Sequence, residues 1–259
     1  MHDVAVRVGG AEWRDWLLHL ADTRTLRRLE VPGDLLEPDP CAVLRLAQHV
    51  GLSVLHVPDA IPPTLSRYAS ETGLADNAVA LASLAAGLQS RVKGGVLYTS
   101  VDLGLDRLAL ECFADGLRRR NRFLRALRGH LEPLGVSLAI RVRWPRPFPG
   151  SHEWEWAGNL LHELRSERCF LAVDVVMQDL PEDFRVEGML RDCAAHLAVV
   201  RLHYRPGLSE CPSLEAWERW AAALRHHAAR LAIVFCPQEP PLASAAEALA
   251  AIEGWAGAM

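Results

Sequence analysis

The sequence predicts a single domain over residues 1–259, folded as a (β/α)8 TIM barrel. Three observations lead to this fold class: eight short apolar runs alternate with helical segments, the composition does not change along the chain, and 259 residues is a suitable length for one barrel. Short apolar runs between polar segments are typical of strands buried on both faces, as in a parallel sheet. The same alternation is compatible with an open doubly wound sheet, which is the alternative.

The first half of the chain supplies four of the predicted strands. They run over residues 4–8, 26–31, 52–57 and 95–99. Predicted helices follow the first three strands, at residues 12–21, 39–51 and 77–90. Pro32-Gly33 ends the second strand, and Asp39-Pro40 begins the second helix with an N-cap and a first-turn proline. A longer polar connection, residues 59–74, precedes the third helix.

The second half repeats the alternation with longer helices. The predicted strands run over residues 136–142, 169–174, 197–204 and 231–235. The predicted helices run over residues 113–134, 153–166, 186–196, 214–229 and 242–255. Apolar residues recur at helical spacing in the first of these helices, and Ser213 is the expected N-cap of the fourth.

Composition and charge exclude several classes of function. Half of the residues are hydrophobic, so a large core forms without disulfides, and the six cysteines are scattered without a C-x-x-C pair. The net charge of −4 gives no basic field for nucleic acid or an anionic membrane. Without a signal-peptide pattern or an apolar run of about 18 residues, we expect a cytoplasmic protein with no membrane partner. Lys93, the single lysine, precedes a strand, which disfavours Schiff-base chemistry.

Two chemically capable side chains end neighbouring predicted strands. Asp174 closes the sixth strand, and His203 lies near the end of the seventh. Barrel enzymes carry their sites at the carboxyl ends of the strands, and an imidazole takes up and releases protons near neutral pH. The pair is therefore the first candidate for catalysis, and a satisfied interior histidine is the alternative for His203.

Five strand segments, taken in order, resemble those of a known family. The segments are Leu29-Glu30-Val31, Leu55-His56-Val57-Pro58, the run from Gly135 to Ile140, Leu171-Ala172-Val173-Asp174 and Val200-Arg201-Leu202-His203. Their order and strand-end pattern are similar to those of the xylose isomerase-like barrels, which include sugar and sugar-phosphate isomerases and epimerases and the family-four apurinic endonucleases. The resemblance implies a divalent metal held by Glu, Asp, His and Glu at the ends of strands five to eight, with a further His three residues after the Asp.

Only half of that ligand set matches this sequence. Asp174 and His203 match, while Arg141, Met177 and Phe235 fall where the first Glu, the further His and the last Glu are expected. A guanidinium repels a cation, and the missing Glu residues are also the acid–base pair of the family's isomerases. We therefore expect a degenerate metal site with no metal ligand and no cofactor, a divalent metal being possible in principle but disfavoured.

The remaining candidates describe a site for a small polar or anionic ligand. Arg141, Arg143 and Arg201 are expected to bind a carboxylate or phosphate, with His56 and Phe235 as further substrate contacts. Glu30 joins Asp174 and His203 as a catalytic candidate, paired with Arg28 or Arg7. The function expected is sugar isomerase-, epimerase- or lyase-like without a metal.

Two alternatives remain open at this point. In the first, the charges of these residues neutralise one another inside a barrel that does no chemistry, in a relative that binds a small anion or a partner protein, including a second copy of the chain. The arginine-rich run from Arg118 to Arg128 suggests either phosphate binding, as in a nucleic-acid enzyme, or a solvated helix face balanced by neighbouring acids. The second reading is preferred for this run.

Overall fold

The fold is taken from a computed structural model of the chain. It describes residues 3–8, 13–23, 26, 28–30, 40–51, 53–58, 98–101, 103, 113–144, 153–177, 186–193, 196–204, 218, 222–223, 232–237 and 245–257.

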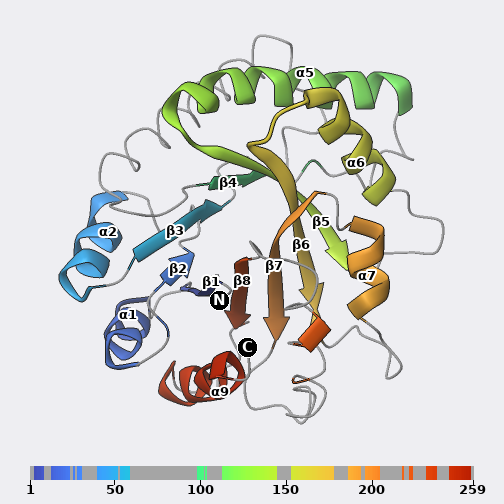
Figure 1. The fold of residues 1–259 in the computed structure, drawn as a ribbon. Coiled ribbons are helices and arrows are strands. Elements are labelled where there is room, and N and C mark those ends of the chain that lie inside the picture. Colours follow the sequence, from blue (N-terminus) through green and yellow to red (C-terminus); the bar gives the residue numbers. More distant parts are fainter. Residues whose placement is uncertain are drawn as a thin grey trace.

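Eight parallel strands form one closed barrel in sequence order, from β1 to β8 (Figure 1). The strands are β1 Asp3–Arg7, β2 Arg28–Glu30, β3 Ser53–Pro58, β4 Tyr98–Val101, β5 Ser137–Trp144, β6 Cys169–Val176, β7 Leu197–Tyr204 and β8 Ala232–Pro237. Pairing of β1 with β8, for example Val4 with Ile233, closes the ring. The predicted barrel is confirmed, and the open-sheet alternative is wrong.

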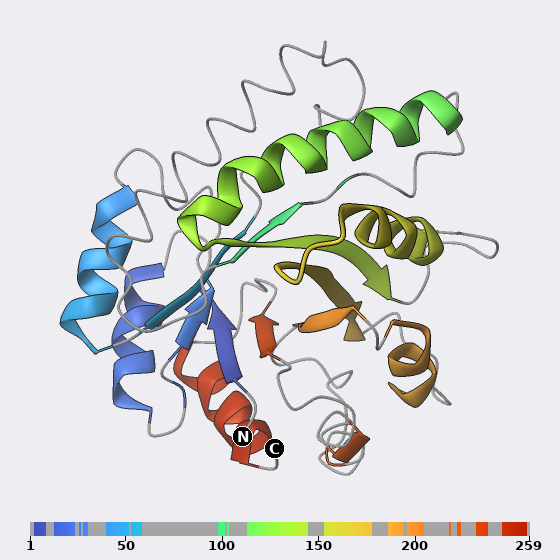
Figure 2. The same ribbon diagram turned by 45° about the horizontal axis from the view of Figure 1, so that its top comes forward.

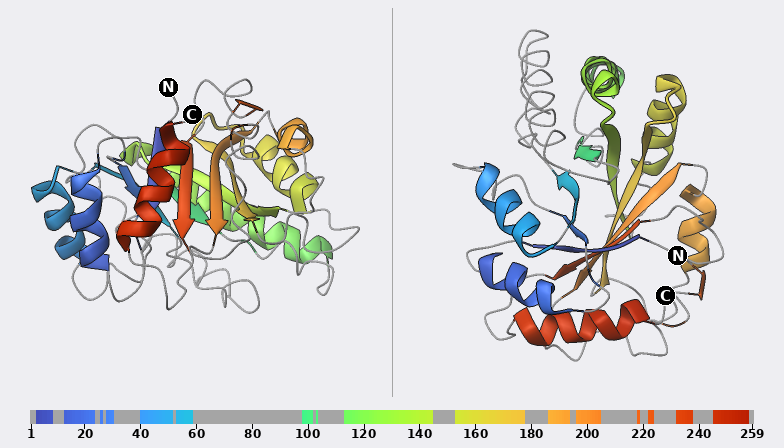
Figure 3. Two further views of the ribbon diagram at one scale, coloured as in Figure 1. Left: turned by 90° about the horizontal axis from the view of Figure 1, so that it is seen from below. Right: turned by 60° about the vertical axis from the view of Figure 1, so that its left-hand side comes forward.

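The helices lie around the outside of the strand ring (Figure 2). They are α1 Trp13–Asp22, α2 Pro40–His49, α5 Phe113–Leu131, α6 Glu153–Leu164, α7 Val186–Cys193 and α9 Ala245–Gly257. The last helix, α9, lies beside α1 and against β8 (Figure 3). The predicted helix at residues 77–90 lies outside the described residues, as does most of the one at 214–229. No helix in the described ranges is long and apolar enough to span a membrane.

Element boundaries differ from the predicted ones where tertiary contacts or turns intervene. The predicted helix at 113–134 stops at Leu131, and a 3-10 turn, Glu132–Leu134, follows it. The turn ends at Gly135, whose φ of 71° lies in the left-handed region that glycine adopts without strain. Strand β4 continues to Val101, two residues past its predicted end, and β6 continues two residues past Asp174.

Strand β5 also extends past its predicted end, and α6 holds the extension. The backbone N–H of Arg143 donates to Glu153 Oε1 at 3.1 Å, and Trp154 Nε1 donates to the Arg143 carbonyl at 3.1 Å. Trp154 also packs edge-on against Trp144, with ring centroids 5.0 Å apart. These contacts satisfy backbone groups at the end of β5 that no longer have β4 beside them.

Side chains on the two faces of the strands form two cores. The outer faces of the strands and the inner faces of the helices make a large apolar core. The inside of the barrel holds a smaller one, formed by Ala5, Tyr98, Ala139, Ala172, Val199, Ala232, Val234 and Cys236. The alanines leave room for the Tyr98 ring, which packs edge-on against Phe170 at 5.5 Å. Between this apolar layer and the carboxyl ends of the strands, the side chains inside the barrel are mostly charged.

Candidate functional site

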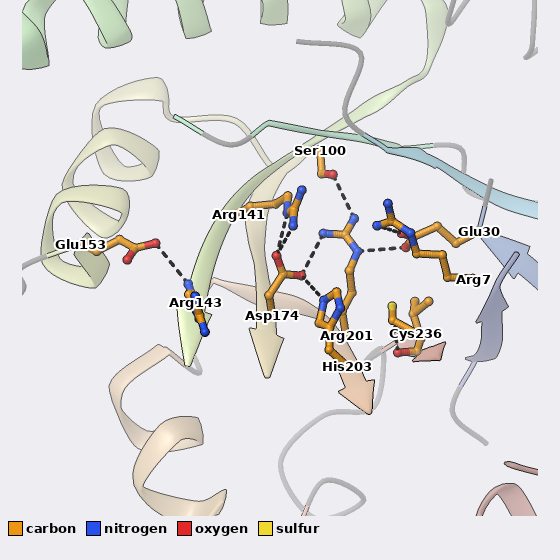
Figure 4. Close-up of polar contacts among 11 residues, drawn as sticks. Arg7, Glu30, Ser100, Arg141, Arg143, Glu153, Asp174, Arg201, His203 and Cys236 are labelled. Atoms are coloured by element: carbon orange, nitrogen blue, oxygen red, sulfur yellow. Dashed lines mark hydrogen bonds and ion pairs between the residues drawn. The ribbon is translucent and has the colours of Figure 1, made fainter. Parts of the chain in front are cut away.

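Seven polar and charged side chains gather inside the barrel toward the carboxyl ends of the strands (Figure 4). We call them the charged cluster, and its members are Arg7, Glu30, Ser100, Arg141, Asp174, Arg201 and His203. Alternation of side chains along each strand turns these residues inward and their neighbours outward. The parallel register places Asp174 directly opposite Arg201 on the adjacent strand.

Arg201 is the centre of the charged cluster. Its side chain has no exposed surface, and Nε donates to Glu30 Oε2 at 2.9 Å. Its Nη2 donates to Ser100 Oγ at 2.9 Å, and its Nη1 lies 3.5 Å from Asp174 Oδ1. One guanidinium from β7 thus links β2, β4 and β6 across the barrel. A buried charge is tolerated only when it is paired in this way.

Asp174 is held by a second arginine and faces the histidine. Arg141 donates to Asp174 Oδ2 through Nε at 2.7 Å and also through Nη2. His203 Nε2 lies 3.3 Å from Asp174 Oδ1. Burial by itself raises the pKa of Asp174, but Arg141, His203 and Arg201 together outweigh it and hold that pKa well below its usual range. Asp174 is therefore ionised near neutral pH and is a poor proton acceptor.

Glu30, like Asp174, contacts two guanidiniums, but its side chain is less exposed to solvent. Its side chain has no exposed surface, and Arg7 Nη1 donates to its Oε1 at 3.2 Å. The predicted pairing with Arg7 is therefore found, and Arg201 holds the other oxygen. Because a guanidinium contacts each oxygen, we infer that Glu30 anchors the two arginines.

Four members of the charged cluster are partly exposed. The side chains of Arg7, Arg141 and His203 are 26%, 19% and 16% exposed. Asp174 is 11% exposed, while Glu30 and Arg201 are fully covered. Among the described charged side chains of the cluster, these two guanidiniums and the imidazole are therefore the most accessible to a small molecule at the carboxyl end of the barrel.

Phe235 does not face the barrel interior, so the prediction that it lines the pocket is wrong. Its ring stacks on Trp255 of α9 with centroids 5.9 Å apart, in the outer core. Because side chains alternate along β8, Val234 and Cys236 point inward instead. The inward position at this strand end is thus Cys236, whose thiol lies 3.7 Å from the Val234 carbonyl. Burial, with the Glu30 charge, raises the pKa of Cys236.

The other predicted substrate contacts are only partly brought together. Arg143 is exposed and lies apart from the charged cluster, on the α6 side of the barrel (Figure 4). Arg201 is fully buried, so its guanidinium holds other members of the charged cluster in place and is not accessible to a ligand. For His56 only the backbone is described, and it pairs with Glu30 on one side and Tyr98 on the other. Met177, at the position where the resemblance places the further His, belongs to the outer core.

Sequence reasoning missed Ser100 as a member of the charged cluster, and it treated Arg7 as no more than a partner of Glu30. Ser100 lies one residue beyond the predicted end of the fourth strand, so its inward direction was not apparent. Arg7 shares its direction along β1 with Ala5, an interior residue, and this alternation is a signal that the sequence does carry.

The residues of the charged cluster do not fit a divalent cation. Guanidiniums contact both oxygens of Asp174, and Arg141 stands at the position where the resemblance places a glutamate ligand. Hard cations need oxygen ligands whose negative charge is not already neutralised. Within the described part of the chain, no three His, Cys, Asp or Glu side chains converge as a metal-binding group.

The arginine-rich helix α5 is largely balanced by its neighbours. Arg118 contacts Asp115, Arg125 Nη2 lies 3.8 Å from Glu163, and Arg128 Nε lies 3.7 Å from Glu132. Arg120 is buried, and its Nε donates to the Leu103 carbonyl at 2.6 Å. These contacts favour a structural role for the helix over phosphate binding.

Solved structures of other proteins share the fold of this chain. The sequence matches no protein-family model and no curated protein. The chain is similar in structure to 3-keto-D-glucoside 4-epimerase from E. coli, with a TM-score of 0.70 and 15% identity over 100% of this chain and 99% of that one. It is also similar to D-allulose 3-epimerase from Methylomonas sp., with a TM-score of 0.68 and 12% identity, covering 98% of each chain.

A third likeness is to AP endonuclease, family 2, from Brucella melitensis. The TM-score is 0.66 and the identity 14%, over 95% of this chain and 96% of that one. At these identities the likeness concerns the fold. The predicted resemblance to the xylose isomerase-like barrels is therefore confirmed as a shared fold, and the chain spans each of these three structures almost completely.

Proposed function

We propose that this barrel catalyses an isomerase- or epimerase-type proton transfer on a small, polar, sugar-like substrate, without a divalent metal. The observation that carries the proposal is the 3.3 Å approach of His203 Nε2 to an ionised Asp174 at the strand ends, where Arg141 stands in place of one expected glutamate ligand. The fold shared with sugar epimerases supports the substrate class.

His203 is the group that moves the proton. Asp174 Oδ1 faces Nε2, so the carboxylate favours a proton on that nitrogen and leaves Nδ1 to accept one. The substrate loses a proton from the carbon beside its carbonyl to Nδ1, and the C–H electron pair moves toward the carbonyl oxygen to give an enediolate. For isomerisation, Nδ1–H returns the proton to the neighbouring carbon while the hydroxyl proton of the enediolate moves to the other oxygen. For epimerisation, a water molecule on the opposite face protonates the same carbon and Nδ1–H gives its proton to solvent.

Arg141 stabilises the negative charge that develops on the enediolate oxygen. Its guanidinium is partly exposed and is held by Asp174. A fixed positive charge close to a developing oxyanion lowers the activation free energy of the reaction, as a bound metal ion does in metal-dependent enzymes. In this scheme Asp174 positions His203 and Arg141, and Glu30 positions Arg7 and Arg201. Neither carboxylate is the base.

A second candidate function is binding without catalysis, of a small anion or of a partner protein. It is favoured by one specific observation: both carboxylates of the charged cluster are already engaged by guanidiniums. The two candidates differ in whether a bound ligand exchanges carbon-bound hydrogen with solvent.

Deuterium exchange in D2O tests the proposal. The protein is incubated with a panel of ketoses, aldoses and sugar acids before and after chelation, and deuterium uptake at carbon is measured by mass spectrometry. We expect uptake that survives chelation, is lost in His203→Gln, and falls strongly in Asp174→Asn. Arg125→Gln, on the outer helix α5, is the control and keeps full activity.

Two results would contradict the proposal. Uptake that disappears on chelation and returns with Mn²⁺ or Mg²⁺ would indicate a metal enzyme. Ligand binding without any uptake, in a protein whose fold is intact by circular dichroism, would favour the second candidate.

A further inference from the structure

We infer that Ser100 is a positioning residue of this site. Its hydroxyl oxygen fixes the guanidinium of Arg201, and Arg201 in turn holds Asp174 in the orientation in which Oδ1 faces His203. This inference rests on the proposed function for the reaction that His203 performs. It adds a fully buried residue of β4 that acts through two other side chains.

The first support is the place of Ser100 in the barrel. Ser100 has no exposed surface, and it lies beside Ala139 of β5 in the parallel register. Ala139 belongs to the small apolar core inside the barrel. Figure 4 shows the Ser100 hydroxyl directed at the guanidinium of Arg201. A buried hydroxyl is destabilising unless it is hydrogen-bonded, so this contact offsets the cost of placing a polar group there.

The second support is the geometry of Arg201. Its Nε donates to Glu30 Oε2 on β2, and its Nη2 donates to Ser100 Oγ on β4, each at 2.9 Å. A guanidinium is planar and rigid, so fixing two of its nitrogens also fixes the position of the third. That third nitrogen, Nη1, lies 3.5 Å from Asp174 Oδ1 on β6. The contact with Ser100 therefore helps to direct Nη1 toward Asp174.

The third support is that Arg201 and His203 approach the same carboxylate oxygen. Arg201 Nη1 lies 3.5 Å from Asp174 Oδ1, and His203 Nε2 lies 3.3 Å from it. Arg141 holds the other oxygen, Oδ2, through Nε at 2.7 Å. Rotation about the Cβ–Cγ bond of an aspartate is only weakly restricted by itself, so contacts at both oxygens are needed to keep Oδ1 facing His203. The contacts thus form a chain from Ser100 through Arg201 and Asp174 to His203.

Deuterium uptake in D2O tests this chain of contacts. Rates are measured over a range of concentrations of the ketose, aldose or sugar acid that the wild type labels fastest. We expect Ser100→Ala to lower kcat about 10- to 100-fold and to leave KM nearly unchanged, because it displaces His203 without removing a contact to the substrate. Ser137→Ala is the matched control and keeps the wild-type kcat, since Ser137 is a buried serine of the adjacent strand β5 outside the charged cluster.

Three further variants separate the hydrogen bond from the space that the side chain fills. Ser100→Cys fills nearly the same space with a weak acceptor, so it should be as slow as Ser100→Ala. Ser100→Thr keeps the hydroxyl and should recover most of the wild-type kcat. In an Asp174→Asn background, Ser100→Ala should lower kcat no further, because the chain of contacts is already broken. Circular dichroism checks each fold, and Ser100→Cys replaces Ser100→Ala if the latter does not fold.

A second readout needs no substrate. With isotope-labelled imidazole nitrogens, NMR spectra show which ring nitrogen carries the proton, and His203→Gln identifies the His203 signal among those of the eleven histidines. We expect the proton of His203 on Nε2 in the wild type, facing Asp174 Oδ1. The share of this tautomer should fall in Ser100→Ala and Ser100→Cys and stay at the wild-type value in Ser137→Ala.

The outcomes separate this inference from the proposed function. A wild-type kcat and a wild-type His203 signal in Ser100→Ala overturn the inference and leave the proposed function standing. Equal effects of Ser100→Ala and Ser137→Ala, or full activity in Ser100→Cys, also overturn it, because the hydroxyl is then not the cause. A His203 signal that changes only in the Ser100 variants, in a protein without deuterium uptake, supports the positioning role of Ser100 and contradicts catalysis.

Discussion

Glu30 and Asp174 are two carboxylates in nearly the same environment that differ in their contact with solvent. Each is contacted by two guanidiniums, and they share Arg201. Glu30 is fully covered, whereas Asp174 is 11% exposed and faces His203. We infer from this difference that Glu30 and its arginines stabilise the barrel interior, whereas Asp174 and the groups it contacts face the ligand.

Removing the shared arginine should have the largest effect. In Arg201→Met, both Glu30 and Asp174 lose one guanidinium inside the barrel, and Ser100 loses its donor. Breaking a buried ion pair from one side costs about 3–5 kcal/mol of unfolding free energy. Urea unfolding measures it, with Arg125→Met on α5 as the exposed control expected within about 0.5 kcal/mol of wild type. A loss no larger than the control's would show that Arg201 is not the link between the two sides.

Removing the charge of Glu30 should lower the free energy of unfolding more than removing the charge of Asp174. Glu30→Gln removes the carboxylate that Arg7 shares with the fully covered Arg201, so we expect a loss of about 3 kcal/mol. Asp174→Asn leaves partly exposed groups that water compensates, so we expect about 1–2 kcal/mol. Paired urea titrations give both values. Equal losses, or a larger loss for Asp174→Asn, would remove the proposed distinction between anchor and ligand-facing side.

Lowering the pH should remove the stabilisation that ionised Asp174 contributes, and we expect this effect to be smaller than those of the preceding substitutions. The pKa of Asp174 is lowered in the folded protein because Arg141, His203 and Arg201 together outweigh the burial that raises it. A lowered pKa stabilises the fold fully above the unfolded value, about 3.9, and this contribution is lost as pH falls below it. Asp174→Asn should therefore show a shallower fall in Tm than wild type from about pH 4 downward. Asp115→Asn, on exposed α5, is the matched control. Parallel curves for wild type and Asp174→Asn would contradict the assigned shift.

Sequence pattern was sufficient for the fold and for part of the site. Alternating apolar runs and helical segments encode strands and helices locally, and eight of them at this length close into one barrel. The positions of Asp174 and His203 at strand ends follow from the strand order alone. The structure pairs Asp174 with Arg141 and brings His203 to within 3.3 Å of Asp174.

Tertiary structure decided what the strand pattern leaves open. Arg201 and Glu30 are 171 residues apart in the chain, and only the closure of the barrel sets them against each other. An error of one position in β8 exchanged Phe235 for Cys236, because inward and outward positions alternate at every residue. Local sequence thus determined which residues reach the carboxyl end of the barrel, while the closed sheet determined which of them are enclosed and which can meet a ligand.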